Sequence, residues 1–194
     1  DVPAGFIMTN FSTVLTWNRR VTDSAPGSLF TMTVSVANLN LRLYAATGFT
    51  LGAQIDSSTS TIQNVEHIYA PTLGAGRYCL EVTSDVTGTD YALAWGGTVL
   101  TAVSTSVNNP AWGSVTPASG NYLVGSSLQF LATPANYYRF SHWTGSLTGT
   151  NNPIVLNLTS NVTVPAVFAE RFTTNYPTPY PWLASYGYTS NQET

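Results

Sequence analysis

Apolar residues alternate with polar ones along two segments in the first half of this chain. Every second residue from Leu39 to Leu43 is leucine, and the same alternation runs from Tyr78 to Val82. A period of two places successive side chains on opposite faces of a strand, so one face is buried and the other is solvated. No window of helical length shows a sustained apolar period of 3.6 residues. The sequence therefore predicts an all-β protein that begins with an antiparallel, jelly-roll-like β-sandwich.

Short strand-like runs follow one another between glycine, asparagine, serine and proline residues, which favour turns. In the first half we expect strands at residues 6–9, 14–21, 29–36, 39–45, 53–57, 65–70, 76–82 and 91–96. Residues 98–105 are rich in threonine, serine and valine, and they either connect two modules or open the second one.

A second set of strand-like runs extends to Phe168 and has its own aromatic residues. Such a unit of about 70 residues is close to the lower limit for independent folding. Proline at every second position from Pro177 to Pro181 predicts a stiff, extended spacer, and a short helix or turn is expected after it. We therefore divide the chain into a sandwich at residues 1–97, a small β-rich domain at 98–172 and a proline-rich linker and tail at 173–194. The expected core of the second domain is Trp112, Phe130, Phe140, Trp143 and Phe168.

Composition excludes several classes of protein. Charged residues make up 8% of the chain, whereas about 25% is usual, and aromatic residues make up 12%. A net charge of −3 together with many aromatic residues argues against disorder and against nucleic-acid binding. No segment has the roughly 18 consecutive apolar residues of a membrane span. The first residues do not form a signal peptide, so we expect an upstream signal or a longer parent chain.

Three segments carry a resemblance in the first module: Asn-Leu-Asn-Leu-Arg-Leu-Tyr at 38–44, Leu-Gly-Ala-Gly-Arg-Tyr at 73–78 and Tyr-Ala-Leu at 91–93. With them, the module resembles the bacterial pre-peptidase C-terminal domain, in the version attached to subtilisin-like serine peptidases. The resemblance implies an eight-stranded sandwich behind a secreted catalytic domain. The family often has aspartate at the positions of Asn38 and Asn40, which weakens any transfer of calcium or collagen binding.

The second module contains the motif Phe-Ser-His-Trp-Thr-Gly at 140–145, preceded by Ala-Thr-Pro at 132–134 and followed by Asn-Pro at 152–153. With these residues it resembles the divergent internalin-type B repeat, a repeat of bacterial surface proteins. The two resemblances together imply a secreted or cell-surface location.

Catalytic machinery is not visible in the sequence. His67 and His142 are the only histidines, neither lies in a subtilisin-like motif, and no Gly-x-Ser-x-Gly elbow occurs. These two residues and Cys79 are too few for a zinc site. The acidic residues are scattered, mostly in loops or on solvated strand faces, so no glycosidase pair is defined. We expect this segment not to be an enzyme, although its parent chain would be a serine peptidase.

Two kinds of binding residue remain as candidates. Aromatic side chains bind sugars or peptides by stacking, although they also fill small cores. The candidates for stacking are Tyr122, Tyr137, Tyr138 and Trp112. Asp85 and Asp90 lie in polar loops and are candidate oxygen ligands for calcium, without the Asp-x-Asp-x-Asp run of a strong calcium motif. No other cofactor is expected.

The main hypothesis is a non-catalytic accessory region of a secreted bacterial protein, with a subtilisin-like peptidase as the parent. It would bind substrate or a surface, act as a spacer, or assist folding and secretion. Its partners would be the upstream catalytic domain and a polysaccharide or protein substrate. The alternatives are a carbohydrate- or matrix-binding module and the structural stalk of a surface adhesin.

Overall fold

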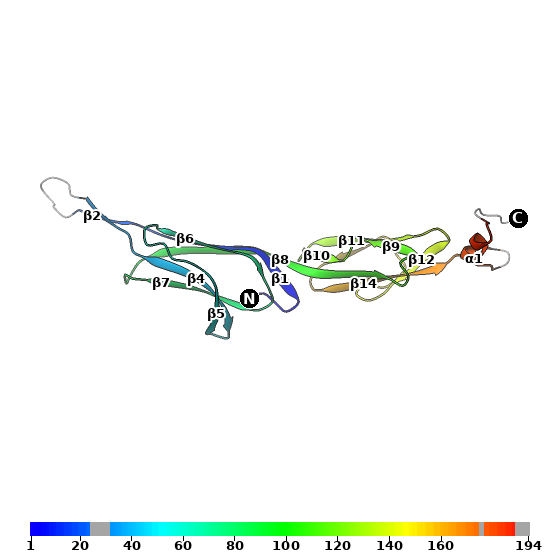
Figure 1. Cartoon of the computed structure of the whole chain (residues 1–194), viewed down its shortest axis with the longest axis horizontal. Helices are drawn as coiled ribbons and strands as arrows, with labels where there is room; N and C mark the ends of the chain where they lie inside the picture. Colours follow the sequence, from blue (N-terminus) through cyan, green and yellow to red (C-terminus); the bar gives the residue numbers. More distant parts are fainter. Residues whose placement is uncertain (24–31, 175–176, 189–194) are drawn as a thin grey trace. The chain divides into compact units, whose positions relative to one another are not determined.

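The computed structural model describes residues 1–23, 32–174 and 177–188, and the chain forms two compact units, Asp1–Val99 and Leu100–Thr194 (Figure 1). The first unit contains β1 (Phe6–Trp17), β2 (Arg20–Asp23), β3 (Met32–Ser35), β4 (Leu39–Thr47), β5 (Thr50–Ser58), β6 (Val65–Leu73) and β7 (Arg77–Ser84). The strand β8 (Tyr91–Val107) belongs to both units. The second unit adds β9 (Gly113–Thr116), β10 (Gly120–Leu123), β11 (Ser127–Pro134), β12 (Tyr138–Trp143), β13 (Ile154–Asn157), β14 (Val162–Glu170) and α1 (Tyr180–Ser185). The prediction of an all-β fold is confirmed.

The first unit is a sandwich of two three-stranded sheets. One sheet has the order β5-β4-β7, and the other is formed by β6, β1 and the first part of β8 (Figure 1). The leucines of β4 that alternate in the sequence, Leu39, Leu41 and Leu43, are fully buried between the sheets. The strands β2 and β3 form a separate hairpin, and residues 29–31 of the strand predicted at 29–36 lie outside the described residues.

The strand β1 joins the strand predicted at residues 6–9 to the first half of the one predicted at 14–21, whose last two residues begin β2. The strand β1 is continuous, and its inward face includes the buried side chains of Phe11, Thr13 and Leu15. A buried threonine fits this face because the Thr13 hydroxyl donates a hydrogen bond to the Ala94 carbonyl at 3.0 Å. Residues 10–13, which were not predicted as strand, therefore lie inside β1.

One acidic residue contradicts the expectation that carboxylates lie in loops or on solvated faces. Glu66 lies on the same face of β6 as Ile68 and is only 1% exposed. Its carboxylate accepts hydrogen bonds from the Ser58 hydroxyl and, at 2.7 Å, from the Ser60 N–H. Both carboxylate oxygens are therefore paired inside the protein, as a buried charge requires.

Residues 98–105, which were predicted to connect two modules or to open the second, lie inside β8. In the first unit β8 pairs with β1, whereas Leu100–Val103 pair with β10 and Val103–Val107 pair with β14. The pairing with β14 is parallel, unlike the other pairings whose register is described.

The core of the second unit lies between the sheet of β8, β12 and β14, with β10 at its edge, and the sheet β13-β11-β9. Phe130, Trp143 and Phe168 are at most 1% exposed, whereas Trp112 and Phe140 are partly buried against them. The aromatic core predicted for this unit is therefore confirmed.

The motif at residues 140–145 is explained by packing. Phe140 and Trp143 pack together with ring centroids 5.0 Å apart, and the Thr144 N–H donates to the Pro165 carbonyl at 3.0 Å. Gly145 has a φ of +82°, and a Cβ there would lie 2.4 Å from the Thr163 carbonyl oxygen. Only glycine fits this close approach between two backbone segments.

The side-chain amide of Asn152 pairs with the backbone of β11 in the way that a neighbouring strand would. Its Oδ1 accepts from the Ala132 N–H at 2.9 Å, and its Nδ2 donates to the Ala132 carbonyl at 2.7 Å. Both backbone groups of Ala132 are thereby paired with one side chain, which ties the loop after β12 to β11.

The tail does not form the predicted spacer up to Pro181. Phe172 pairs with Pro179, the Thr173 N–H donates to the Thr178 carbonyl at 3.1 Å, and α1 begins at Tyr180 with a proline in its first turn. Proline is well tolerated there, because the first turn of a helix has no N–H partner to lose. Residues 175–176 and 189–194 of the predicted tail lie outside the described residues. Within the described part of the chain, no helix is long and apolar enough to cross a bilayer.

Candidate binding pocket

A polar pocket of about 370 Å³ opens on the second unit, where the loop before β12 meets the returning tail. Three tyrosines and one arginine contribute the large side chains. The lining residues are Pro134, Ala135, Asn136, Tyr137, Tyr138, Arg171 and Tyr180, and we refer to this site as the tyrosine pocket.

Backbone hydrogen bonds fix the loop that carries two of the tyrosines. The Ala135 N–H donates to the Trp112 carbonyl at 2.9 Å, and the Tyr138 N–H donates to the Ala135 carbonyl at 3.1 Å, which closes a turn. Tyr137 lies in that turn with a φ of +70°, a left-handed conformation that is rare for a bulky residue. Such strain is often found where a side chain has a functional role.

The returning tail closes the other side of the tyrosine pocket. The Arg171 N–H donates to the Tyr137 carbonyl at 2.8 Å, and the Tyr180 N–H donates to the Arg171 carbonyl at 2.9 Å. Tyr180 is buried and stacks on Tyr137 with ring centroids 6.4 Å apart. The order of the pocket therefore depends on the tail.

Arg171 supplies the positive charge of the pocket. Its guanidinium carbon lies 5.6 Å from the centre of the Tyr180 ring, within the range of a cation–π contact. Neither of the two ion pairs among the described residues involves Arg171. Because Arg171 lines the tyrosine pocket, its planar guanidinium supplies donors that suit a carboxylate or the hydroxyl groups of a ligand.

Three of the four predicted stacking residues lie at or beside the tyrosine pocket. Tyr137 and Tyr138 line it, and Trp112 stacks on Tyr138 with ring centroids 5.0 Å apart. Tyr122 lies elsewhere: it packs against the core, and its hydroxyl donates to the Ala118 carbonyl at 2.7 Å.

Sequence reasoning missed Arg171 and Tyr180 as pocket residues. Tyr180 stands between two prolines and was assigned to a spacer, while Arg171 follows Glu170 just after a strand and belongs to no binding motif. The sequence feature that could have identified Tyr180 is its aromatic ring, since an aromatic residue in a proline-rich segment can pack on a neighbouring domain.

The two candidate calcium ligands have different surroundings. The Asp85 carboxylate accepts from the Asn38 N–H at 2.8 Å, whereas Asp90 lines a shallow pocket beside Trp17 and Tyr91. In the described part of the chain, no group of three or more His, Cys, Asp or Glu residues could hold a metal ion. Calcium binding at these aspartates stays a prediction.

Both histidines form local contacts with serine. His67 Nε2 lies 2.9 Å from the Ser12 hydroxyl on an exposed strand face, and His142 Nδ1 lies 3.0 Å from the hydroxyl of its neighbour Ser141. No carboxylate contact to His67 is found among the described residues. Each histidine therefore has a hydrogen-bonding role, and within the described ranges neither contact is joined by the orienting carboxylate of a triad.

A polar cluster lies on the outer face of the sheet β5-β4-β7. Arg42 and Glu81 form an ion pair at 3.2 Å, and the Tyr44 hydroxyl donates to the same carboxylate at 3.3 Å. Desolvation and the nearby Glu81 carboxylate raise the pKa of Tyr44. The tyrosine therefore stays protonated at neutral pH and serves as a hydrogen-bond donor.

Residues 103–171 match the family model of the divergent InlB B-repeat domain. Over these residues the second unit is similar to a bacterial repeat domain. The match confirms the resemblance that was based on the motif at residues 140–145, and the matched residues include Arg171 and the loop of Tyr137. No curated protein and no solved structure matches this chain. The resemblance of the first unit to the pre-peptidase C-terminal domain stays a prediction.

Proposed function

We propose that this chain is a non-catalytic accessory region of a secreted or cell-surface bacterial protein, and that its second unit binds a carbohydrate in the tyrosine pocket. The match of residues 103–171 to a bacterial repeat domain carries the first part of this proposal. The parent protein would be a subtilisin-like peptidase, a point that rests on the resemblance of the first unit. A catalytic domain encoded immediately upstream of Asp1 would support this parent, and a different upstream domain would contradict it.

The composition of the tyrosine pocket supports a carbohydrate ligand. Tyrosine rings offer apolar faces to the C–H groups of a sugar, and their hydroxyls offer hydrogen bonds to its polar groups. The guanidinium of Arg171 would pair with the carboxylate of an acidic sugar. The protein as a whole has a net charge of −3 and therefore does not attract anions in general. The positive charge of Arg171 would instead select acidic sugars at this one site.

Replacing Arg171 with glutamine is expected to weaken binding to acidic glycans by at least about tenfold, because one charge-assisted contact is removed. The full chain and the variant would be compared on a glycan array that contains neutral and acidic polysaccharides. Hits would then be measured by calorimetry.

The matched control is Arg139→Gln. Arg139 is exposed on β12, outside the lining of the tyrosine pocket, so its loss should leave binding unchanged. Equal losses for the two variants would indicate non-specific charge attraction and would contradict a site at Arg171. Binding to collagen in a pull-down, with no hit on the glycan array, would show that the ligand is a protein and would contradict carbohydrate binding.

The accessory role also predicts the absence of hydrolysis. The full chain should show no turnover of casein or of small esters above the buffer control, and Ser12→Ala and His67→Ala should change nothing. The serine–histidine contact at 2.9 Å makes these the most informative variants. Turnover that disappears in either variant would contradict the proposal.

A further inference from the structure

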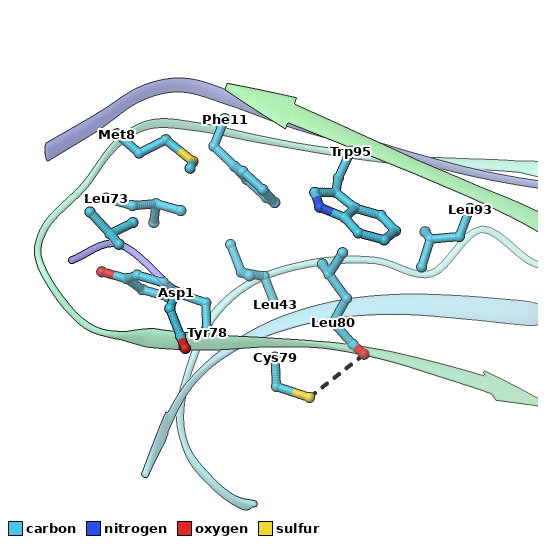
Figure 2. Close-up of a pocket in the computed structure, with 11 residues that line it drawn as sticks. Asp1, Met8, Phe11, Leu43, Leu73, Tyr78, Cys79, Leu80, Leu93 and Trp95 are labelled. Carbon is cyan, nitrogen blue, oxygen red and sulfur yellow. Dashed lines mark hydrogen bonds between the residues drawn. The ribbon is translucent and has the colours of Figure 1, made fainter. Parts of the chain in front are cut away.

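An open pocket of about 450 Å³ lies between the two sheets of the first unit (Figure 2). Tyr78 and Leu80 line it from β7, and Leu93 and Trp95 line it from β8. Leu80 lies opposite Leu93 and Trp95, whereas Tyr78 lies beside Leu73 (Figure 2). The lining is mostly apolar. We refer to this opening as the edge pocket.

The strands on both sides of the edge pocket are edge strands. Among the described residues, β7 pairs along its length only with β4, and β8 pairs within the first unit only with β1. On the opposite side of the sandwich, β6 packs against β4 and β5 and closes the core. An edge strand presents a row of unpaired N–H and C=O groups. The edge pocket is therefore an apolar opening bordered by free backbone hydrogen-bonding groups.

Side chains that face inward at this edge are incompletely covered. Trp95 is 66% exposed, although it points into the edge pocket, and Tyr91, on the same face of β8 by alternation, is 52% exposed. The inward leucines of β4 are fully buried. The sandwich thus lacks a cover over the inner face of β8, where one more strand would fit.

The N-terminal residues show which kind of segment pairs with this edge. Val2 forms an antiparallel bridge with Gly76, with the two N–H···O hydrogen bonds at 2.8 and 2.9 Å, and its side chain is only 4% exposed. The Asp1 carboxylate binds the Arg77 guanidinium through two contacts, at 2.9 and 3.0 Å. A two-residue stretch of strand therefore already lies on the free edge of β7.

This bridge sets the register for any further strand. Because backbone groups of alternate residues face the same edge, the outward N–H and C=O groups after Gly76 belong to Tyr78, Leu80 and Val82. Residues opposite these three would point their side chains into the sandwich, as Val2 does. The intervening residues would point to solvent, as Asp1 does.

We propose that the edge pocket binds an extended strand of a partner polypeptide, antiparallel to β7, with valine or leucine at every second position. The partner backbone would pair with Tyr78, Leu80 and Val82. Its apolar side chains would fill the space between Leu80 and Trp95. This strand-addition mode gives affinity through the backbone and selectivity through the alternate side chains. It is independent of the carbohydrate site of the second unit.

The test uses the full chain and a short acetylated and amidated peptide in which valine alternates with threonine. Binding should slow the hydrogen exchange of the Tyr78, Leu80 and Val82 amides and should leave the Leu41 amide in the central strand unchanged. A control peptide carries N-methyl groups on its valines, which removes the hydrogen bonds that the peptide donates to β7. The bulk of the methyl groups also keeps its carbonyls away from the β7 amides, while the side chains stay the same. This control peptide should not protect the β7 amides.

A matched pair of variants tests the apolar wall. Trp95→Ala should weaken binding of the valine–threonine peptide on the order of tenfold, because a large aromatic contact is lost. Trp182→Ala removes a tryptophan of similar exposure from the second unit and should leave binding unchanged.

Three results would overturn the proposal. They are the absence of protection at the highest soluble peptide concentration, equal protection by the N-methylated peptide, and protection confined to other strands. Protection of the same amides that rises with protein concentration in the absence of peptide would show that a second copy of this chain, and not a partner, occupies the edge.

Discussion

Replacement of Trp143 by alanine is expected to lower the free energy of unfolding of the second unit by about 3–5 kcal/mol. The side chain is 1% exposed and has an edge-on contact with Phe130, with ring centroids 6.5 Å apart. Its Nε1 donates to the Asn151 carbonyl at 2.8 Å, so the substitution also removes a hydrogen bond. In a small domain such a loss is a large part of the total stability.

Urea unfolding followed by circular dichroism would measure this effect. The control is Trp182→Ala, because Trp182 is 54% exposed on α1 and its loss should change stability by less than about 0.5 kcal/mol. If the two tryptophan variants were equally stable, the assignment of Trp143 to the core would be wrong.

Replacement of Glu66 by alanine is expected to destabilise the first unit by about 3 kcal/mol, an unusual result for the loss of an acidic side chain. The Ser60 N–H and the Ser58 hydroxyl would both lose their acceptor in the interior. Glutamine, which keeps one carbonyl acceptor, should be less harmful than alanine.

Glu81→Gln provides the comparison for this prediction. Glu81 pairs with Arg42 on a half-exposed face, and such ion pairs contribute about 0–1 kcal/mol. Thermal unfolding of the three variants at neutral pH should therefore give the order Glu81→Gln, Glu66→Gln and Glu66→Ala, from most to least stable. A Glu66→Ala variant as stable as Glu81→Gln would show that water satisfies the two donors.

The fold class could be predicted from the sequence because alternation is a local property. The spacing of the β4 leucines and the size of the aromatic residues near Trp143 were enough to predict that these side chains are buried. The continuity of β1 could not be predicted in the same way. Its burial of Thr13 depends on an acceptor, the Ala94 carbonyl, that lies far away in the sequence.

The tyrosine pocket was predicted in part, for a similar reason. Tyr137 and Tyr138 were predicted as stacking residues because aromatic side chains can bind a ligand. Arg171 directly follows β14, and Tyr180 lies in a tail whose prolines predicted an extended spacer. Only the hydrogen bonds from Arg171 to Tyr137 and from Tyr180 to Arg171 bring them to the site. Local propensity could not reveal a contact that depends on the tail folding back.

The amide of Asn152 also has a chemical consequence. Asparagine side chains age when the next backbone nitrogen attacks the amide and forms a cyclic imide, which then opens to an acidic residue. Here the next residue is Pro153, whose ring nitrogen carries no hydrogen, and the amide itself is held by two hydrogen bonds to Ala132. The hydrogen bonds of Asn152 that connect the loop after β12 to β11 are thus protected from deamidation.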